Sequence, residues 1–289
     1  MAKDELRISI QPHQLILARY RHGSRLAVAR KIVSIELQDA GTEENSIAKK
    51  TDQQTYRWAA IAASLRHALT DTQWLGCVPT IVLSSHFCRY LVIGWNADIA
   101  NDEEQQAYLR HCFSMAYGDV VQSWDLRMSI AGYAKPALAS GIPAALLHAI
   151  ETEIAQAGMQ AEYVYPQLML AFNEIASHLG NKKLSVGTFP SSLWMGSVEQ
   201  GRLCIGLIEN TRWRSVKNVA AGNDLPRQIQ TIIQRESILA GITEDAPVFL
   251  HETDAHGKSI VSRIEINTSN ARNDETPATA GNEPVQAWG

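Results

Sequence analysis

The residues of this chain that could do chemistry form three small groups, the first of which is a serine-serine-histidine run. Ser84, Ser85 and His86 follow an apolar stretch with the composition of a buried strand. Strand ends are where α/β proteins often place reactive groups, so a nucleophile and its base are conceivable here. Adjacent residues in a strand point to opposite faces, however, and Ser85 and His86 would not meet. We interpret the run as a polar strand end.

The second group combines imidazole and thiol side chains. His86 lies near Cys88, and His111 is next to Cys112, so together they could offer four ligands to zinc. Cys112 falls on the apolar face of an expected helix and Cys88 within an expected strand, where cysteine ordinarily acts as a small hydrophobic residue. No Cys-x-x-Cys spacing occurs among the cysteines of the chain, which are Cys77, Cys88, Cys112 and Cys204. We therefore expect reduced core thiols and no metal.

The third group interleaves aromatic and basic residues: Trp194, Arg212, Trp213 and Arg214. This pattern is compatible with nucleic-acid binding. Strand alternation explains it more simply, with Trp213 on one face and the two arginines on the other. The net charge of −4 and the pI near 6.1 give no general attraction to nucleic acid or anionic lipid. We expect no nucleic-acid partner.

Common catalytic motifs do not occur in the sequence. The chain lacks the G-x-x-x-x-G-K-[ST] phosphate loop, the G-x-S-x-G hydrolase turn and the H-E-x-x-H metalloprotease helix. The simplest enzyme classes are thereby excluded.

The elements that would position these groups suggest an internal duplication. Three strand-like runs at 7–11, 14–20 and 25–37 precede a helix expected at about 52–69. Three more, at 191–200, 201–210 and 211–220, precede a helix at 225–241 whose apolar face carries Leu225, Ile229, Ile232 and Leu239. Two copies of three antiparallel strands and a helix predict an α/β fold with two facing lobes.

The middle of the chain adds further elements. Strands are expected at 77–85, 87–95 and 124–130 and a helix at 101–117, so that residues 86 to about 135 form a small inserted β-α-β subdomain. A helix from Pro143 to Gly158, a strand at 161–165 and a helix at 166–179 follow. The last strands are expected at 247–252 and 258–266, around a turn at 254–257.

Length and composition set the domain limits. With 289 residues and 45% hydrophobic residues, two lobes are expected, at 1–180 and 181–266. Residues 267–289 have almost nothing to bury and should be disordered. The first residues lack the apolar core of a signal peptide and no apolar run is long enough to cross a bilayer, so we expect a cytosolic chain with no direct membrane insertion.

In this order the elements resemble the actin-like proteins of bacterial pilus and secretion-system assembly: the PilM and MshI types and the cytoplasmic part of the type II secretion L component. The resemblance covers residues 5 to about 250. It is strongest in the local features Cys88–Trp95, the acidic helix start Asp102-Glu103-Glu104, Ala157-Gly158 and Val164-Tyr165-Pro166. It implies an actin-like (ribonuclease H-like) duplicated fold, with the β-α-β piece beside the first lobe.

The same resemblance implies that the nucleotide site is degenerate. Nucleotide-binding members carry two Asp-x-Gly turns, in which backbone amides approach phosphates and the carboxylates organise the metal. The first turn aligns with Ser9 to Gln11, and both acid and glycine are missing. The second aligns with Trp194 to Gly196, where an indole replaces the acid. The glycine-rich adenosine turn is represented by 248–257, with one late glycine. No cofactor or metal is expected.

The resemblance also implies a partner. PilM-like proteins hold the cytoplasmic tail of a bitopic, PilN-like inner-membrane protein near the small subdomain, where this chain has Arg89, Trp95, Trp124 and Tyr133. These residues either pack the subdomain or bind a peptide. The expected function is a non-catalytic cytoplasmic scaffold, peripheral to the inner membrane, for a type IV or MSHA-like pilus or a type II secretion system. The alternatives are an ATPase or phosphotransferase with displaced metal ligands, and a self-associating filament former.

Overall fold

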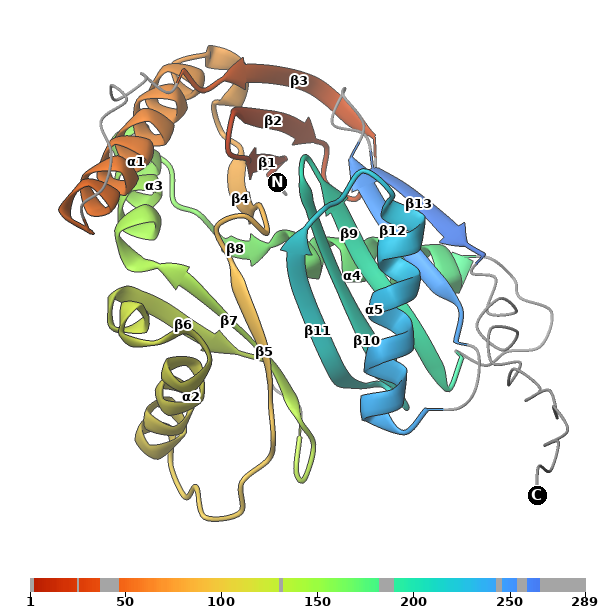
Figure 1. Ribbon diagram of the computed structural model, residues 1–289. Helices are drawn as coiled ribbons and strands as arrows, with labels where there is room; N and C mark the ends of the chain where they lie inside the picture. The colour runs from red at the N-terminus through yellow and green to blue at the C-terminus, as the bar shows by residue number, and fades with distance from the viewer. Residues whose placement is uncertain are drawn as a thin grey trace, which may run out of the picture.

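Three β-sheets and five α-helices make up the part of the chain that the structure, a computed structural model, describes (Figure 1). The described residues are 3–24, 26–36, 47–129, 132–181, 190–242, 246–253 and 259–265. The turn expected at 254–257 and the tail expected at 267–289 lie outside them.

The first sheet has the order β3-β2-β1-β4-β8. β1 and β2 form an antiparallel hairpin, whereas β4 runs parallel to both β1 and β8. β4 is apolar along nearly its whole length because it is covered on both faces, as parallel strands generally are. The strands are β1 (Glu5–Ile10), β2 (Gln14–Tyr20), β3 (Ala27–Ser34), β4 (Val78–Leu83) and β8 (Tyr163–Pro166).

The second sheet repeats this arrangement with the order β11-β10-β9-β12-β13. β9, β10 and β11 form an antiparallel meander and β12 runs parallel to β9, as β4 does to β1. The last strand differs, because β13 is antiparallel to β12. The strands are β9 (Ser192–Glu199), β10 (Arg202–Glu209), β11 (Arg212–Ala220), β12 (Val248–Thr253) and β13 (Ser259–Ile264).

The small sheet contains a strand that the sequence did not predict. β7 (Ala137–Pro143) lies between β5 (Arg89–Ile93) and β6 (Trp124–Met128), antiparallel to both. It pairs with both neighbours, so the small sheet extends past residue 135, where the inserted subdomain was expected to end. Alanine, serine and glycine hid the strand because these residues have low strand propensity. Packing requires them: a Cβ on Gly141 would lie 2.8 Å from the Trp124 ring and 3.0 Å from the Phe113 ring.

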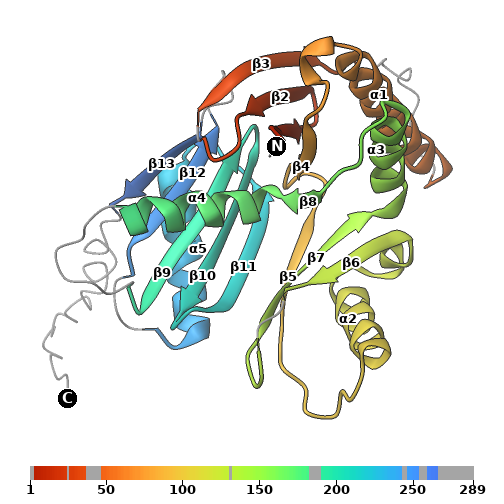
Figure 2. The ribbon, with the colours of Figure 1, turned by 180° about the vertical axis from the view of Figure 1, so that it is seen from behind.

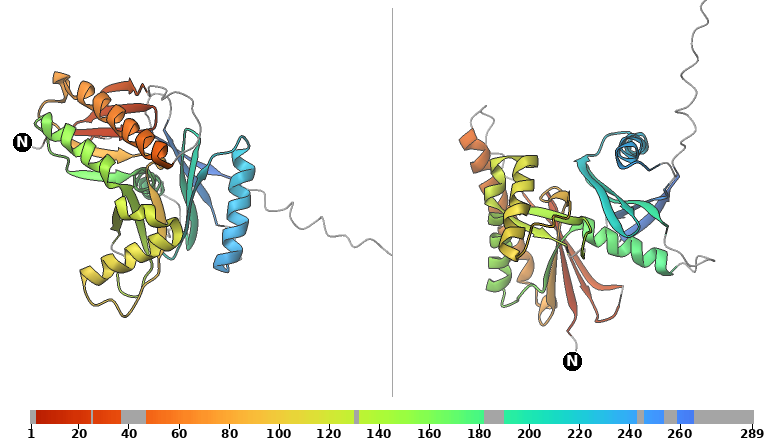
Figure 3. Two further views of the ribbon diagram at one scale, coloured as in Figure 1. Left: turned by 60° about the vertical axis from the view of Figure 1, so that its left-hand side comes forward. Right: turned by 90° about the horizontal axis from the view of Figure 1, so that it is seen from below.

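Helices cover the sheets on separate faces. α1 (Ile47–Leu69) and α3 (Ala144–Gln156) lie side by side on the first sheet (Figure 3). Arg66 of α1 clamps the buried Glu153 of α3 with two hydrogen bonds of 2.6 and 2.8 Å, and this contact lowers the pKa of Glu153. α2 (Asp102–Tyr117) covers the small sheet with Leu109 and Phe113.

The second sheet is covered on both faces, by α5 (Leu225–Ala240) on one side and by α4 (Gln167–Asn181) on the other (Figure 3). α5 begins at its cap Asp224 and ends at Gly241, which has a left-handed φ of +69°. Leu225, Ile229 and Ile232 face the sheet as predicted. The placement of Leu239 on that face was wrong, because its side chain is 71% exposed.

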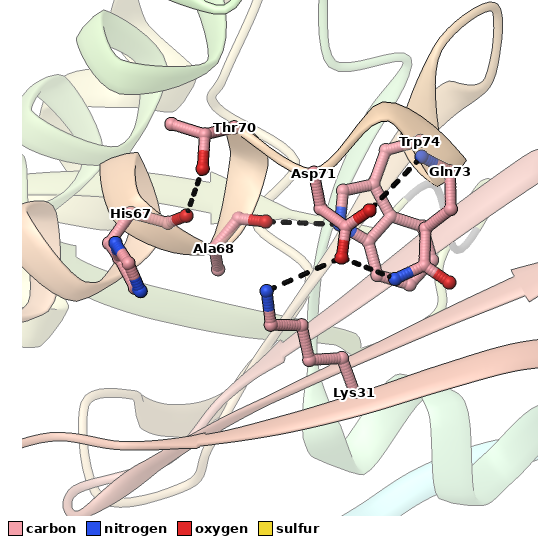
Figure 4. A network of polar contacts seen from close by, with 7 residues as sticks. All are labelled: Lys31, His67, Ala68, Thr70, Asp71, Gln73 and Trp74. Atoms are coloured by element: carbon pink, nitrogen blue, oxygen red, sulfur yellow. Dashed lines mark hydrogen bonds and ion pairs between the residues drawn. The ribbon is translucent and has the colours of Figure 1, made fainter.

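A polar network fixes the connection between α1 and β4 (Figure 4). Asp71 accepts hydrogen bonds from the backbone N (3.2 Å) and side-chain N (2.7 Å) of Gln73, and Lys31 of β3 lies 3.4 Å from the same carboxylate. The Trp74 indole, fully buried, donates to the Ala68 carbonyl at 3.0 Å. This short 3-10 turn (Thr72–Trp74) therefore anchors the edge strand β3 to the end of α1.

His251, on β12, is a buried histidine between the two halves of the chain. Its Nε2 lies 2.7 Å from the Ser259 hydroxyl, and its Nδ1 lies 3.5 Å from the Gln167 amide at the start of α4. Burial, and secondarily the Arg7 guanidinium, lower the pKa of His251 to about 4. The folded protein therefore takes up this proton less readily than the unfolded chain.

The first prediction concerns the loss of folding stability at low pH that His251 causes. Stability from neutral His251 is complete above the unfolded pKa of about 6.5, and is lost as the pH falls toward 4. The loss amounts to about 1 kcal/mol at pH 5.5 and about 3 kcal/mol at pH 4. Urea unfolding at pH 7.5, 5.5 and 4.5 measures it. His251→Asn should flatten this dependence, and the control His13→Gln, at an exposed position, should retain it. An unchanged pH dependence in His251→Asn would refute the assignment.

Candidate functional site at the lobe junction

Two hairpin turns occupy equivalent places in the two large sheets, because both sheets have the same strand order. The first, between β1 and β2, includes Gln11, whose backbone N donates to the Gln14 carbonyl at 3.0 Å. The Gln14 side chain also donates to the Gln11 side-chain oxygen at 2.7 Å. Ser9 pairs with Ile16 within the sheet. Neither Ser9 nor Gln11 supplies a carboxylate for a cation.

The second turn is not where the sequence placed it. Trp194 and Gly196 lie inside β9, paired with Leu207 and Ile205 of β10, and Trp194 is 1% exposed. The turn at the end of this hairpin is Glu199-Gln200-Gly201, with a φ of +69° at Gly201. The second turn thus has both an acid and a glycine. Trp194 and Gly196, which the resemblance placed at the second turn, therefore lie in a strand and not at a turn.

A different requirement explains the glycine at 196. A Cβ at this position would collide with the Cys204 carbonyl oxygen and lie 3.0 Å from Ile205 Cα, so β9 and β10 approach too closely for a side chain. A glycine within a strand often marks such a close approach. The turn signal Glu199-Gln200-Gly201 was visible in the sequence and identifies the correct position.

The acid of the second turn is already engaged by the first lobe. The backbone N of Ser85, in the segment that follows β4, donates to Glu199 Oε1 at 2.9 Å. His86 Nε2 donates to the Gln200 carbonyl at 2.8 Å. From β11, Asn218 Nδ2 donates to the carbonyls of Ser85 (2.7 Å) and Cys88 (3.0 Å). The segment Ser84–Cys88 and the turn Glu199–Gly201, with Asn218, form what we call the lobe junction.

The edge strands β5 and β11 lie beside each other next to this junction (Figures 1 and 2). Burial raises the pKa of the Cys88 thiol to about 12 and that of the Cys204 thiol well above its usual value. Burial also lowers the pKa of His86, so the imidazole is neutral near pH 7. Because their pKa values are raised, the two thiols are poor nucleophiles. The His86 ring binds the Gln200 carbonyl and not the Ser85 side chain. The sequence had predicted that Ser85 and His86 would not meet.

The four residues predicted to bind a partner fall into two pairs. Arg89 and Trp124 begin β5 and β6 at the same end of the small sheet, opposite Gly141 and Pro143 of β7. Trp95 and Tyr133 lie beyond the other end. The Arg89 guanidinium donates to the carbonyls of His86 (3.2 Å) and Cys88 (2.9 Å).

Trp124 is a packing residue. Its ring lies 5.6 Å from Tyr117 and covers Gly141, in the core of the small subdomain.

Trp95 and Tyr133 form an exposed aromatic pair. Their rings lie 5.0 Å apart in an edge-on arrangement, and the residues are 44% and 84% exposed. Exposed aromatic side chains that support each other are typical anchors for a protein partner. The structure therefore brings together two of the four predicted residues on one surface.

Within the described ranges, no three His, Cys, Asp or Glu side chains are grouped so as to hold a metal ion. No helix among those same residues is both long and apolar enough to span a bilayer.

No protein-family model matches the sequence, and no curated protein is similar to it in sequence. Solved structures do show similarity. The cytoplasmic domain of EpsL, an inner-membrane component of the type II secretion system of Vibrio cholerae, superposes with a TM-score of 0.53 at 10% identity, covering 86% of this chain and 82% of that chain.

Two further structures give the same result. A Bacteroides thetaiotaomicron protein of unknown function with an actin-like ATPase fold has a TM-score of 0.52 at 10% identity, with 88% of this chain and 82% of that chain covered. The PilM–PilN type IV pilus biogenesis complex has a TM-score of 0.52 at 11% identity, with 80% of this chain and 65% of that chain covered. The predicted fold class, a duplicated actin-like α/β fold, is confirmed.

Proposed function

We propose that this protein is a non-catalytic scaffold that binds the cytoplasmic tail of a bitopic inner-membrane protein during assembly of a pilus or secretion system. Two similar structures support the setting, since one is a cytoplasmic domain from a secretion system and the other a PilM–PilN complex. In this proposal the protein is cytoplasmic and peripheral to the inner membrane through its partner. Its lobes comprise residues 1–180 and 181–266.

One observation carries the non-catalytic part of the proposal. Glu199, the acid of the second turn, accepts a hydrogen bond from the Ser85 backbone, and the first turn contains Gln11 where an acid would be needed. An actin-like ATPase uses acids at both turns to organise Mg²⁺ and its water. Here one acid is missing and the other is bound to protein.

The partner site is placed at the Trp95–Tyr133 pair. Of the four residues predicted to bind a partner, Arg89 and Trp124 are left out of this site. Arg89 donates to carbonyls of the lobe junction, and Trp124 packs on Gly141. A short tail that becomes ordered on binding would bury the two exposed rings.

The second prediction tests this site. A photo-crosslinking amino acid at position 133 should capture an inner-membrane protein with a short cytoplasmic segment before one transmembrane helix. A synthetic peptide of that segment should bind with a Kd of about 1–100 µM, and Trp95→Ala should weaken binding about tenfold or more. Isothermal titration calorimetry measures both.

Met115, on α2 and 77% exposed, provides a matched control position for crosslinking. Equal capture from positions 115 and 133, or peptide affinity unchanged by Trp95→Ala, would rule out the aromatic pair as the docking site.

The alternative function, a nucleotide-dependent ATPase or phosphotransferase, is favoured by a single observation: the acid-x-glycine turn Glu199–Gly201. The two functions differ in a direct assay. The scaffold should show no Mg²⁺-dependent ATP hydrolysis above a buffer blank, whereas hydrolysis that Glu199→Gln abolishes would establish the enzyme.

A further inference from the structure

The hairpin formed by β2 and β3, residues 14–34, differs in charge from the rest of the molecule; we call it the basic hairpin. It contains five of the 26 lysines and arginines of the chain and none of its 30 acidic residues. The hairpin thus carries a formal charge of +5 and the remaining residues −9, which together give the net charge of −4. Arg19 is paired with Asp4 at 2.8 Å and Lys31 with Asp71 at 3.4 Å. The hairpin stays positive after these two pairs are counted.

The basic hairpin also carries exposed apolar side chains. Leu26, Val28 and Ile32 are 79%, 50% and 43% exposed. Alternate residues of a strand share a face, so Val28 and Ile32 lie on the outer side of β3. On the inner side, Ala29 and Val33 pack against the core of the first lobe. Apolar side chains that gather in the open on one element mark an interaction surface.

The tip of the hairpin, between β2 and β3, hydrogen-bonds its own backbone groups. Ser24 N donates to the Arg21 carbonyl at 2.9 Å, and Gly23 permits this turn with a φ of +75°. The Ser24 hydroxyl accepts from Leu26 N at 3.1 Å and donates to the Leu26 carbonyl at 3.2 Å. Backbone groups that already have partners cost less free energy to move out of water. Leu26 can therefore enter an apolar phase at low cost.

The outer edge of β3 opposes pairing with a further strand. Among the residues that the structure describes, β3 pairs only with β2, and Figures 1 and 2 show it along the rim of the molecule. A register shift at Arg19 and Tyr20 interrupts the ladder, and Arg30 and Lys31 lie near the centre of the strand. Bulges and central cations keep edge strands from pairing with other chains. Two β3 strands paired about their centres would also place like charges opposite each other. Both an added peptide strand and a second copy of this chain are therefore disfavoured.

We propose that the basic hairpin is a membrane-contact element that binds the surface of an anionic lipid bilayer. Its cations complement the headgroups, and Leu26, Val28 and Ile32 enter the layer just below them. A flat lipid surface needs neither a groove nor an open strand edge. The net charge of −4 does not reveal this site, because charges more than about 10 Å away are screened by salt. The contact is separate from the Trp95–Tyr133 pair and goes beyond the scaffold function.

The third prediction tests this contact with the full-length protein and lipid vesicles. Vesicles that contain phosphatidylglycerol should bind the protein about tenfold or more tightly than vesicles of phosphatidylcholine alone, because only the former carry a negative surface charge. Sodium chloride at high concentration should remove most of the difference, since it screens that charge. Sedimentation of the protein with the vesicles over a range of lipid concentrations measures both effects.

Two matched pairs of variants separate the hairpin from the rest of the surface. Arg21→Glu should weaken binding to the anionic vesicles about tenfold. Arg212→Glu, at an exposed position of β11, changes the net charge equally and should stay within about twofold of wild type. Leu26→Ser should weaken binding about threefold or more, whereas Leu239→Ser, at an exposed position of α5, should not. Because all four positions are exposed, the thermal midpoints should stay close to wild type.

The proposal is overturned if the protein binds phosphatidylglycerol vesicles no better than phosphatidylcholine vesicles, or if each control variant loses as much affinity as its hairpin counterpart. Binding of polyglutamate, weakened by Arg21→Glu, without binding of vesicles would also overturn it and assign the hairpin to an acidic protein. Its failure is distinct from failure of the scaffold function, because Leu26→Ser should bind the partner peptide as tightly as wild type in the calorimetric assay.

Discussion

Gly196→Ala is expected to lower the free energy of unfolding by about 3 kcal/mol, one of the largest effects of any single methyl group in this protein. The new Cβ would meet the backbone carbonyl of Cys204 rather than a flexible side chain. Two paired strands, β9 and β10, would have to separate, and they form the centre of the second lobe. Chemical denaturation followed by circular dichroism measures the loss.

Gly94→Ala is the matched control. A Cβ on Gly94 would meet no atom within 4 Å, and Gly94 is not among the glycines with positive φ. Its denaturation midpoint should stay close to that of the wild type. If Gly196→Ala is as stable as Gly94→Ala, the close approach of β9 to Cys204 is not present in solution.

Trp194→Ala is expected to have the second large effect, a loss of about 3–5 kcal/mol. The indole is 1% exposed and packs with Leu203, Leu207 and Ile229 between the second sheet and α5. Truncation removes many contacts and leaves a cavity that this rigid sheet cannot close. Urea denaturation compared with wild type gives the difference.

Trp95→Ala supplies the contrast, since Trp95 is 44% exposed and its ring packs edge-on against that of Tyr133. Its loss of stability should be well under half that of Trp194→Ala. A further variant, Trp194→Asp, would place an acid at the position where the family resemblance implied that nucleotide-binding members carry one. It should unfold rather than gain Mg²⁺ affinity, because the carboxylate would be buried in an apolar core. A folded, Mg²⁺-binding Trp194→Asp protein would support the placement of the second turn at Trp194 to Gly196.

The sequence was informative where local pattern and packing agree. The hairpins of 5–20 and 192–220 carry alternating or β-branched strands with turn residues between them, so their existence and pairing were predictable. The helix around Ile229 likewise combined a capping Asp224, an apolar stripe and Gly241. In these segments the short-range signal is also the one that tertiary contacts reinforce.

Prediction failed where tertiary contacts override local preference. β7 is a central strand made of small residues because the rings of Phe113 and Trp124 occupy the space above Gly141. Gly196 suggested a turn, but it is a point of close strand contact. For β7 the constraint comes from residues of other elements, so its own sequence could not reveal the strand; for Gly196 the neighbouring turn signal Glu199-Gln200-Gly201 already gave the right position.

The candidate site was the least predictable part. Ser85, Glu199 and Asn218 are ordinary polar residues in their own segments, and only the packing of the two lobes brings them together. By contrast, Trp95 and Tyr133 were both among the residues predicted to bind a partner. Their sequence positions did not show that the two rings pack against each other.

Helix α4 has a practical consequence for dissecting the molecule. It continues directly from β8 of the first sheet, yet Ile175 and Leu179 share a hydrophobic cluster with Met195 and Phe249 of the second. Dividing the gene after residue 181 would expose the apolar face of α4 in one fragment and the apolar face of the second sheet in the other. Both fragments should aggregate when expressed alone. Dividing it before Gln167 keeps α4 with the surface it covers, which makes that the sensible place for a split reporter or an independently produced half.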